Sequence, residues 1–515
     1  MQRRLILYSF LALFFIAGIL PVLSLITSSL FKDGVFDLSQ FEAIYKNIFL
    51  HGTAFSLLKN TFLLSSSVTV ISVIIGVTMG IIFEKTDSCC SKLFIFIFAM
   101  PLFVPPYITA VSWHMLTGIN GFAGSVLVLS SSYIAIPLFI TIFFLKSVDP
   151  ALEQAALVSS SWFRVIAKIT LPLIMPGVAA SAVIVFLLTS GEITVPSFLG
   201  YNVFALESFT AFTASYDFKA ATILALPLIG FPFILFLLEF YLYKNLKSTA
   251  FKNLTAFKNK LKIKLKKNKI LLLSSVVSAG FTIAVLPVLI LIINAKTLSN
   301  YKAAFTLAGN TLLRSIFYSI AGATMLTVTG FFLGYMVNSK KEKLWPIADF
   351  GSLFLFTLPG SVTAIGLIGL WNRPETLFIY SSFLIIIIGY TAKYSAVTIR
   401  IISAWLSTIS STVNDAAKLS GAGWIRTITF ITAPLSAKGI AVAWIAGYLF
   451  SLRDTTITMM VYPPGHDTLP VRILTLMANG QPEIIAALCI IMIAAATIPV
   501  FMLWIIFKLI QKEKL

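Results

Sequence analysis

Long apolar runs separated by short polar segments dominate the pattern of hydrophobic and polar positions along this chain. A helix that crosses a bilayer needs about 20 largely apolar residues, and runs of that length recur throughout the 515 residues. The pattern predicts an all-helical membrane protein of roughly twelve spans. These predicted spans lie near residues 5–28, 60–83, 93–116, 122–145, 178–198, 220–243, 270–294, 311–337, 346–370, 377–400, 439–461 and 484–508.

The composition excludes a soluble globular protein. Mean hydropathy is +0.96, 58% of residues are hydrophobic and only 11% are charged, far from the averages of soluble domains. The first apolar run follows Arg3 and Arg4 but is too long for a secretory signal, so we expect a retained first helix. Three cysteines and three histidines are scattered without the spacing of a metal site, so no metal is expected.

Basic residues predict the orientation. With the amino terminus in the cytoplasm, the inside segments collect 27 of the 38 Lys and Arg residues, in the direction of the positive-inside rule. Both termini are then cytoplasmic. Topology and anionic lipid headgroups account for the net charge of +19, so we expect membrane lipid and no nucleic acid as a partner.

The chain repeats itself. Asn60 and Asn310 open two spans 250 residues apart, and a Pro-x-x-x-Thr-Ala pattern recurs 254 residues later. Such self-similarity indicates two parallel, pseudo-symmetric six-helix halves. We predict a first transmembrane domain at 1–243, a basic cytoplasmic linker at 244–269, and a second transmembrane domain at 270–515.

Within this repeat, one cytoplasmic segment carries the same pattern twice. An acid, two alanines, a small-residue turn and a proline occur in each copy, and 19 residues separate acid from proline in both. The pattern predicts a short helix-turn-helix on the membrane surface. The residues are Glu153, Ala155, Ala156, Ser159 and Pro172 in the first copy, and Asp415, Ala416, Ala417, Gly421 and Pro434 in the second.

These two segments resemble the cytoplasmic "EAA" coupling loops of ABC importer permeases. Two copies in one chain imply a fused permease of the type I family, most like the ferric-iron, thiamine and phosphonate groups, in the bacterial inner membrane. The resemblance implies a dimer of ATP-binding subunits inside and a solute-binding protein outside. No phosphate-binding loop of the G-x-x-x-x-G-K-[ST] kind occurs in the chain. Hydrolysis, with its ATP and magnesium, is therefore expected on the partner, and no catalytic residue or cofactor is expected here.

Each residue type suits such a loop. Glu153 and Asp415 would start short helices, where the dipole favours an acid, and the alanines would leave a smooth surface for a partner. Gly421 stands where the chain must reverse with positive φ. Ser159 replaces glycine in the first copy, so either that turn is built differently or the serine is strained. Pro172 and Pro434 are expected to stop the second short helix.

A second matched pair of acids, Glu192 and Asp454, stands 262 residues apart inside apolar runs. Charges there usually face a cavity or a partner, so both are candidates for the translocation path. The alternative is structural: Asp454 pairs with Arg453, or both acids cap interrupted helices. Pro105 and Pro359 interrupt spans three and nine and are expected to line the central opening.

Outside the membrane, a stretch containing Pro463, Pro464 and Gly465 is similar to a loop of ferric-iron-type fused permeases. The resemblance implies a docking place for the solute-binding protein. Thiamine, phosphonate and polyamines remain alternative substrates to ferric iron.

The sequence argues against two functions of other classes. An ion-coupled secondary transporter also has six plus six helices, but the loop between spans two and three lacks the Gly-x-x-x-Asp-Arg pattern of that class. A membrane enzyme would need clustered His, Cys or paired acids in a cytoplasmic loop, and no such cluster occurs there.

Overall fold

The computed structural model describes residues 2–32, 35–36, 53–87, 91–215, 221–224, 226–230, 233, 261–265 and 269–512. Within them nearly all ordered backbone is helical, apart from a hairpin of two-residue strands, β1 (Phe31–Lys32) and β2 (Val35–Phe36). This confirms the all-helical class. Most of the linker 244–269 and of the sixth predicted span, 220–243, lies outside the described residues.

Eight described helices are long and apolar enough to cross a membrane, and the number rises to eleven if each of three bent pairs is one span. The eleven correspond to the predicted spans other than the sixth. Three spans are broken by sharp bends: 96° within 93–117, 111° within 345–371 and 76° within 424–453. A bend of this size needs backbone polar groups to find partners other than the helix, because lipid offers none.

The chain folds into two compact units that interleave along the sequence. One unit contains residues 54–204 and 230–297. Its helices are α4 (Thr53–Lys85), α5 (Ser91–Ala99), η2 (Met100–Leu102), α6 (Pro106–Thr117), α7 (Gly121–Tyr133), α8 (Ala135–Leu145), α9 (Pro150–Leu157), α10 (Trp162–Val165), η3 (Ile166–Thr170), α11 (Leu171–Ser190), α12 (Thr194–Phe198), α15 (Lys269–Gly280), η6 (Phe281–Val285) and α16 (Leu286–Ala295).

The other unit contains residues 1–53, 205–229 and 298–515. Its helices include α1 (Gln2–Phe14), η1 (Phe15–Ile19), α2 (Leu20–Leu30), α13 (Phe204–Ser215, starting at the boundary), α17 (Leu298–Ser339), α18 (Trp345–Thr357), α19 (Gly360–Trp371), η7 (Pro374–Thr376) and α20 (Leu377–Tyr380). They continue with α21 (Leu384–Leu406), α22 (Ser411–Leu419), α23 (Trp424–Thr427), η8 (Ile428–Thr432), α24 (Ala433–Leu435), α25 (Ala437–Arg453), α26 (Thr456–Val461), α27 (Leu469–Asn479) and α28 (Pro482–Lys512).

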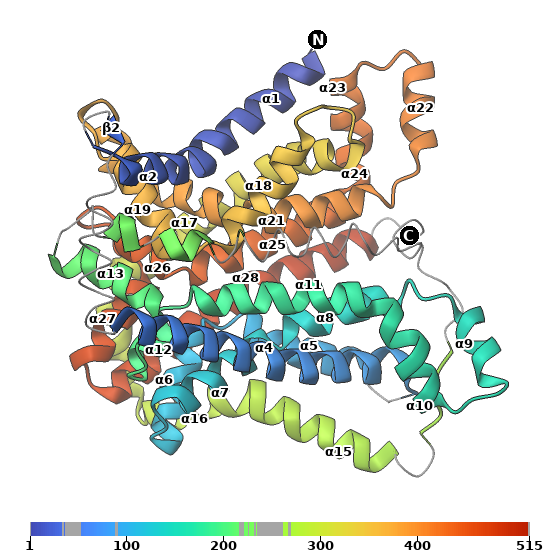
Figure 1. Cartoon of the computed structure of the whole chain (residues 1–515), viewed down its shortest axis with the longest axis horizontal. Helices are drawn as coiled ribbons and strands as arrows, with labels where there is room; N and C mark the ends of the chain where they lie inside the picture. The colour runs from blue at the N-terminus through green and yellow to red at the C-terminus, as the bar shows by residue number, and fades with distance from the viewer. Residues whose placement is uncertain are drawn as a thin grey trace. The chain divides into compact units, whose positions relative to one another are not determined.

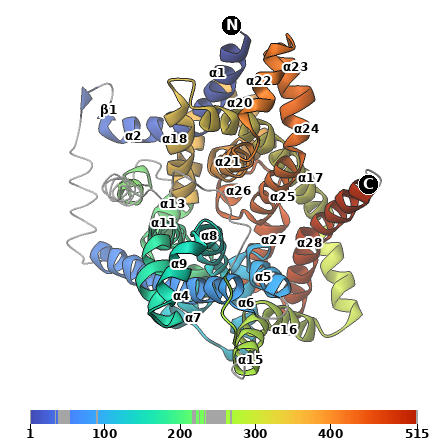
Figure 2. The same cartoon turned by 90° about the vertical axis from the view of Figure 1, so that its right-hand side faces the viewer.

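The first helices of each sequence half pack on the broken span of the other half. In one unit α16 packs on α6, and the Ser112 hydroxyl donates to the carbonyl of Pro287 at 2.8 Å. In the other unit α2 packs on α19, where the carbonyl of Pro21 approaches Gly366 so closely that an added Cβ would lie 2.8 Å from it. Figures 1 and 2 show α15 and α16 beside α5 and α6, and α1 and α2 with the helices that follow residue 298. The compact units are therefore not the two sequence halves, although the halves themselves repeat.

Small residues set the distances between spans. A Cβ added at Gly76 would lie 2.6 Å from Pro137, and one at Gly80 would lie 2.8 Å from Thr141, where α4 meets α8. Gly330 and Gly334 repeat the arrangement where α17 meets α21. Without a hydrophobic force between helices in lipid, such close approach is a main source of packing energy. These glycines therefore allow α4 to approach α8 closely and α17 to approach α21 closely.

We expect Gly330→Ile to destabilise the protein by about 1–3 kcal/mol, since the Thr398 hydroxyl lies 2.5 Å from the position of an added Cβ and overpacked sites cost that much. The measurement is thermal unfolding of the detergent-solubilised chain. Gly423→Ala is the control, because nothing lies within 4 Å of its added Cβ. Equal melting of both variants would contradict the packing role.

Candidate functional site

The first predicted coupling loop is a helical elbow at the end of α8 and before α11, and it projects beyond the long helices of its unit (Figure 1). Asp149 caps its first helix, α9, by accepting a hydrogen bond from the Ala151 amide at 2.9 Å. Pro150 suits the first helical position, because a backbone amide there would have no hydrogen-bond partner within the helix and proline has no amide hydrogen to leave unpaired. The chain then turns and continues through α10 and η3 into α11. The helix-turn-helix expected at this place is confirmed.

Glu153 does not face the outside of the elbow. Its side chain is fully buried, and one carboxylate oxygen lies 2.6 Å from the Lys85 amine while the other accepts from the Thr170 hydroxyl at 2.8 Å. Lys85 is the last residue of α4, and Thr170 is the last of η3. The acid therefore ties the elbow to two other helices. Sequence reasoning placed Lys85 only as a cytoplasmic charge and missed this pairing.

The second elbow is built from α22, a glycine turn and α23 (Figure 2). Gly421 has φ +74°, and the next amide, of Ala422, donates to the carbonyl of Ala417 at 3.0 Å. This left-handed closure of a helix end is the conformation that only glycine adopts freely, as the sequence predicted. Asp415 is expected to start this helix, but it lies in the middle of α22, which begins at Ser411. Its side chain lies outside what the structure describes.

The first turn is built differently, which answers the question that Ser159 raised. Its φ is not positive, since the described non-glycine residues with positive φ are Lys296 and Lys340. Instead the Ser159 amide donates to the carbonyl of Ala156 at 3.3 Å, as the helix tightens at its end. The serine therefore carries no left-handed strain.

Pro172 does not stop a helix, contrary to expectation. Helical backbone runs from Trp162 to Ser190 without a break. A π-helical turn, η3, directly precedes the proline, and its wider hydrogen-bond spacing accommodates a residue that has no amide to donate. The second copy has a π turn, η8, at the matching place, but there the helix does break, two residues after Pro434 at Ser436.

The alanines divide between two faces. Ala155 and Ala416 are exposed, whereas Ala156 is half-buried and Ala417 is buried. Large apolar side chains, not alanines alone, form the outer surface of both elbows. Among them Val158 is 89% exposed and Leu419 is 91% exposed. Phe163 and Phe430 are also exposed. Exposed apolar groups of this size favour contact with lipid or with a partner protein over contact with water.

Glu192 and Asp454 each occupy a helix break and cap the short helix that follows it. Glu192 accepts hydrogen bonds from the amide and hydroxyl of Thr194, at the start of α12. Asp454 accepts from the amide and hydroxyl of Thr458 in α26, both at 2.9 Å. A tyrosine hydroxyl donates to each acid as well: Tyr133 to Glu192 at 3.4 Å and Tyr394 to Asp454 at 2.7 Å. The capping alternative therefore describes both acids, because most of their acceptor sites are used.

Pro105 and Pro359 stand at the sharpest bends. Each has extended backbone, with ψ of 137° and 142°, and immediately precedes a helix, α6 or α19. Both prolines are buried inside their own units, where α6 packs on α12 and α19 packs on α26. Each proline break thus lies against the short helix that the matching acid caps. A role in the translocation path stays a prediction for all four residues.

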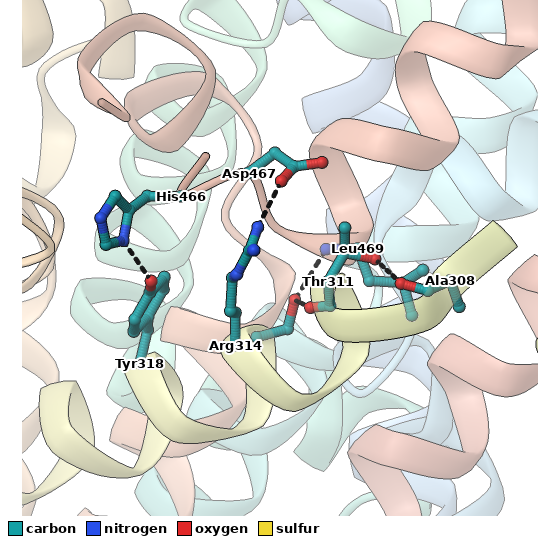
Figure 3. Close-up of polar contacts among 8 residues, drawn as sticks. Ala308, Thr311, Arg314, Tyr318, His466, Asp467 and Leu469 are labelled. Carbon is teal, nitrogen blue, oxygen red and sulfur yellow. Dashed lines mark hydrogen bonds and ion pairs between the residues drawn. The ribbon is translucent and has the colours of Figure 1, made fainter. Parts of the chain in front are cut away.

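The predicted docking stretch forms a tight loop between α26 and α27, shown in Figure 3. Pro463 is buried, Pro464 and Gly465 are exposed, and Gly465 has φ +80°. Two contacts to α17 hold the loop: Arg314 to Asp467 at 2.8 Å, and the Tyr318 hydroxyl to a His466 ring nitrogen at 2.6 Å. The Leu469 amide donates to the Ser315 hydroxyl at 2.7 Å. Sequence reasoning missed these anchors.

Broken spans, close helix contacts at paired glycines and two helical elbows with exposed apolar tips together describe a multi-pass membrane protein. Comparison with known proteins agrees. Residues 72–248 match the family described as binding-protein-dependent transport system inner membrane component, so the chain carries a permease domain of that family.

Relatives extend the similarity over nearly the whole chain. Fe(3+)-transport system permease protein FbpB 2 of Haemophilus influenzae is 21% identical, with 87% of this chain and 89% of the relative covered. Ferric transport system permease protein FbpB of Actinobacillus pleuropneumoniae is also 21% identical, over 97% and 78%. A putative 2-aminoethylphosphonate transport system permease protein, PhnV, of Salmonella typhimurium is 33% identical over 21% of this chain and 42% of its own length.

If Asp454 acts as a cap, Asp454→Asn keeps an acceptor for the Thr458 amide and preserves folding. Asp454→Ala leaves the first turn of α26 without this acceptor. Loss of a cap costs about 0.5–2 kcal/mol, so the alanine variant should melt at a lower temperature than the asparagine variant. Glu192→Gln and Glu192→Ala form the matched pair in the other unit. If both asparagine and glutamine variants melt as low as the alanine variants, charge and not capping is the role of these acids.

Proposed function

We propose that this chain is the membrane permease of an ATP-driven, binding-protein-dependent importer in a bacterial inner membrane, with both termini cytoplasmic. Two ATP-binding subunits would grip the elbows, one at each. The observation that carries this is the duplicated elbow, with Val158 and Leu419 extending their apolar side chains into solvent. ATP and magnesium would bind the partner subunits, and the chain itself would supply mechanical motion and no chemistry.

Ferric iron is the substrate that best fits the comparisons, because the relatives that align along most of the chain carry ferric transport names. A phosphonate or a polyamine is the alternative, in view of shorter matches to permeases named for those solutes; thiamine is a further one. Glu192 and Asp454 support a cation only weakly, since helix amides and hydroxyls occupy their oxygens. Selectivity would then rest mainly with the solute-binding protein.

The loop at 463–467 is the proposed docking place of that binding protein. Three features hold its exposed tip, Pro464 and Gly465, in place: the buried Pro463, the Arg314–Asp467 ion pair and the Tyr318–His466 hydrogen bond. A preorganised loop loses less entropy when a partner binds than a floppy one does.

The elbow proposal predicts that Val158→Asp and Leu419→Asp each weaken binding of the ATP-binding subunit by about tenfold, or about 1.4 kcal/mol. A charge would replace the apolar contact without entering the folded interior. Co-purification of a tagged chain with its ATPase measures this. Ala417→Asp is a poorer choice, since Ala417 is buried and the variant would disturb folding as well.

Leu298→Asp is the matched control, because Leu298 is 74% exposed and its predicted topology places it at the outer end of α17. Wild-type levels of ATPase with both elbow variants would contradict the docking role. Uptake driven by an ion gradient alone, without any ATPase, would instead favour a secondary transporter.

The docking loop gives a separate prediction. Arg314→Gln releases Asp467 and should weaken the binding protein's affinity by about fivefold, equivalent to about 1 kcal/mol for a charge-assisted pair. Titration of labelled binding protein onto the reconstituted permease measures the Kd. Arg373→Gln, at an exposed arginine, is the control. An unchanged Kd for Arg314→Gln would place the docking surface elsewhere.

A further inference from the structure

Lys85 and Glu153 form a buried ion pair that joins a spanning helix to the first elbow. The Lys85 side chain is 7% exposed and that of Glu153 is 0% exposed. The amine and carboxylate lie 2.6 Å apart, and the Thr170 hydroxyl satisfies the second carboxylate oxygen. A buried charge is tolerated only when paired and hydrogen-bonded, so separating α9 from the end of α4 would leave two charges without partners.

The backbone around Lys85 is also held. The Ile263 amide donates to the Lys85 carbonyl at 2.7 Å, and the Asp87 amide donates to the Ile263 carbonyl at 3.1 Å. The Leu265 amide then donates to the Asp87 carboxylate at 3.1 Å. A segment of the linker thus holds the backbone at the end of α4 in place. The Lys85 side chain therefore contacts the elbow from a fixed position.

Thr170, the third member of this cluster, ends the π turn η3. A π turn inserts an extra residue into a helix and is a weak point, often found at functional sites. Force applied at α9 could therefore bend the chain at η3 instead of reaching the spans. The contact of Glu153 with both Thr170 and Lys85 bridges across this weak point.

In the second unit the residue that matches Lys85 also contacts the elbow. Tyr335 lies in α17, 250 residues after Lys85, the offset that also relates Gly80 to Gly330. The Trp424 ring nitrogen donates to the Tyr335 hydroxyl at 3.3 Å, and the two rings meet edge to face at 6.0 Å. Trp424 starts α23, the helix that leads into the second π turn, η8. The link between span and elbow is kept while its chemistry changes.

We propose that Lys85 is a positioning residue for transport: its buried pair with Glu153 makes α9 and α4 move as one body, so that motion of the ATPase turns the span and does not bend the elbow. Tyr335, through Trp424, does the same in the second unit. This inference rests on the proposed function, and Lys85 touches neither substrate nor ATPase in performing it.

The test uses the double variant Lys85→Met/Glu153→Gln, which removes both charges and leaves no unpaired buried ion. In proteoliposomes holding permease, ATPase and a binding protein loaded with radioactive ferric ion, the ATPase should still co-purify and hydrolyse ATP. Uptake per ATP should fall by at least about fivefold, the size of an ordinary coupling between sites. Lys262→Met, which removes an exposed lysine of the linker, is the control and should keep the wild-type ratio.

A second measurement needs no substrate. Spin labels at Thr78→Cys in α4 and Ser159→Cys in the elbow, both exposed positions, report their separation in a chain whose own three cysteines are replaced. We expect one narrow distance distribution with Lys85 and Glu153 present and a broad one in the double variant. Single replacement Lys85→Arg, which keeps the charge, should keep it narrow.

An unchanged uptake-to-ATP ratio together with an unchanged distance distribution would overturn the positioning role of Lys85. Failure of the wild-type chain to retain any ATPase would overturn the proposed function instead. The spin-label result separates these cases, because it depends on the permease alone.

Discussion

One constraint organises this molecule: backbone amides and carbonyls inside a bilayer must find partners within the protein. A continuous helix meets this constraint with its own hydrogen bonds, as in α4 with 33 residues and α28 with 31. α17 is kinked at Gly309, where φ is +43°. Every break in a span has to be repaired locally. At the breaks, acidic side chains accept hydrogen bonds from free backbone amides, and packing buries the bent backbone. The candidate functional residues lie at these breaks.

The repairs follow a common scheme in both units. At Pro105 and Pro359 the chain bends sharply inside protein, away from lipid. Opposite each bend lies a short helix, α12 or α26, whose start is capped by Glu192 or Asp454. The acids that look like pathway charges in the sequence are thus first of all helix caps, since a charged group in the span is tolerable once amides and hydroxyls surround it.

Local patterns in the sequence were sufficient for most of the architecture. The spans follow from the length of the apolar runs, and the left-handed turn follows from Gly421. Pairings between distant segments were not predictable. Nothing near Lys85 or Glu153 in the sequence tells that they meet, and the π turn that lets the helix pass Pro172 has no residue signature of its own. The interleaving of the two compact units along the sequence could not be predicted for the same reason, because it depends on which helix packs on which.

In both units a side chain near the end of a long span contacts the elbow, but the chemistry of that contact differs. Lys85 with Glu153 and Tyr335 with Trp424 share no functional groups, yet each fixes the end of a long span to the elbow beside it. The ion pair is strong at short range and intolerant of separation, since either charge alone is costly when buried. The aromatic pair is weaker and tolerates sliding, because edge-to-face contact persists over a range of distances. On that ground we expect the first elbow to be held more rigidly to its span than the second.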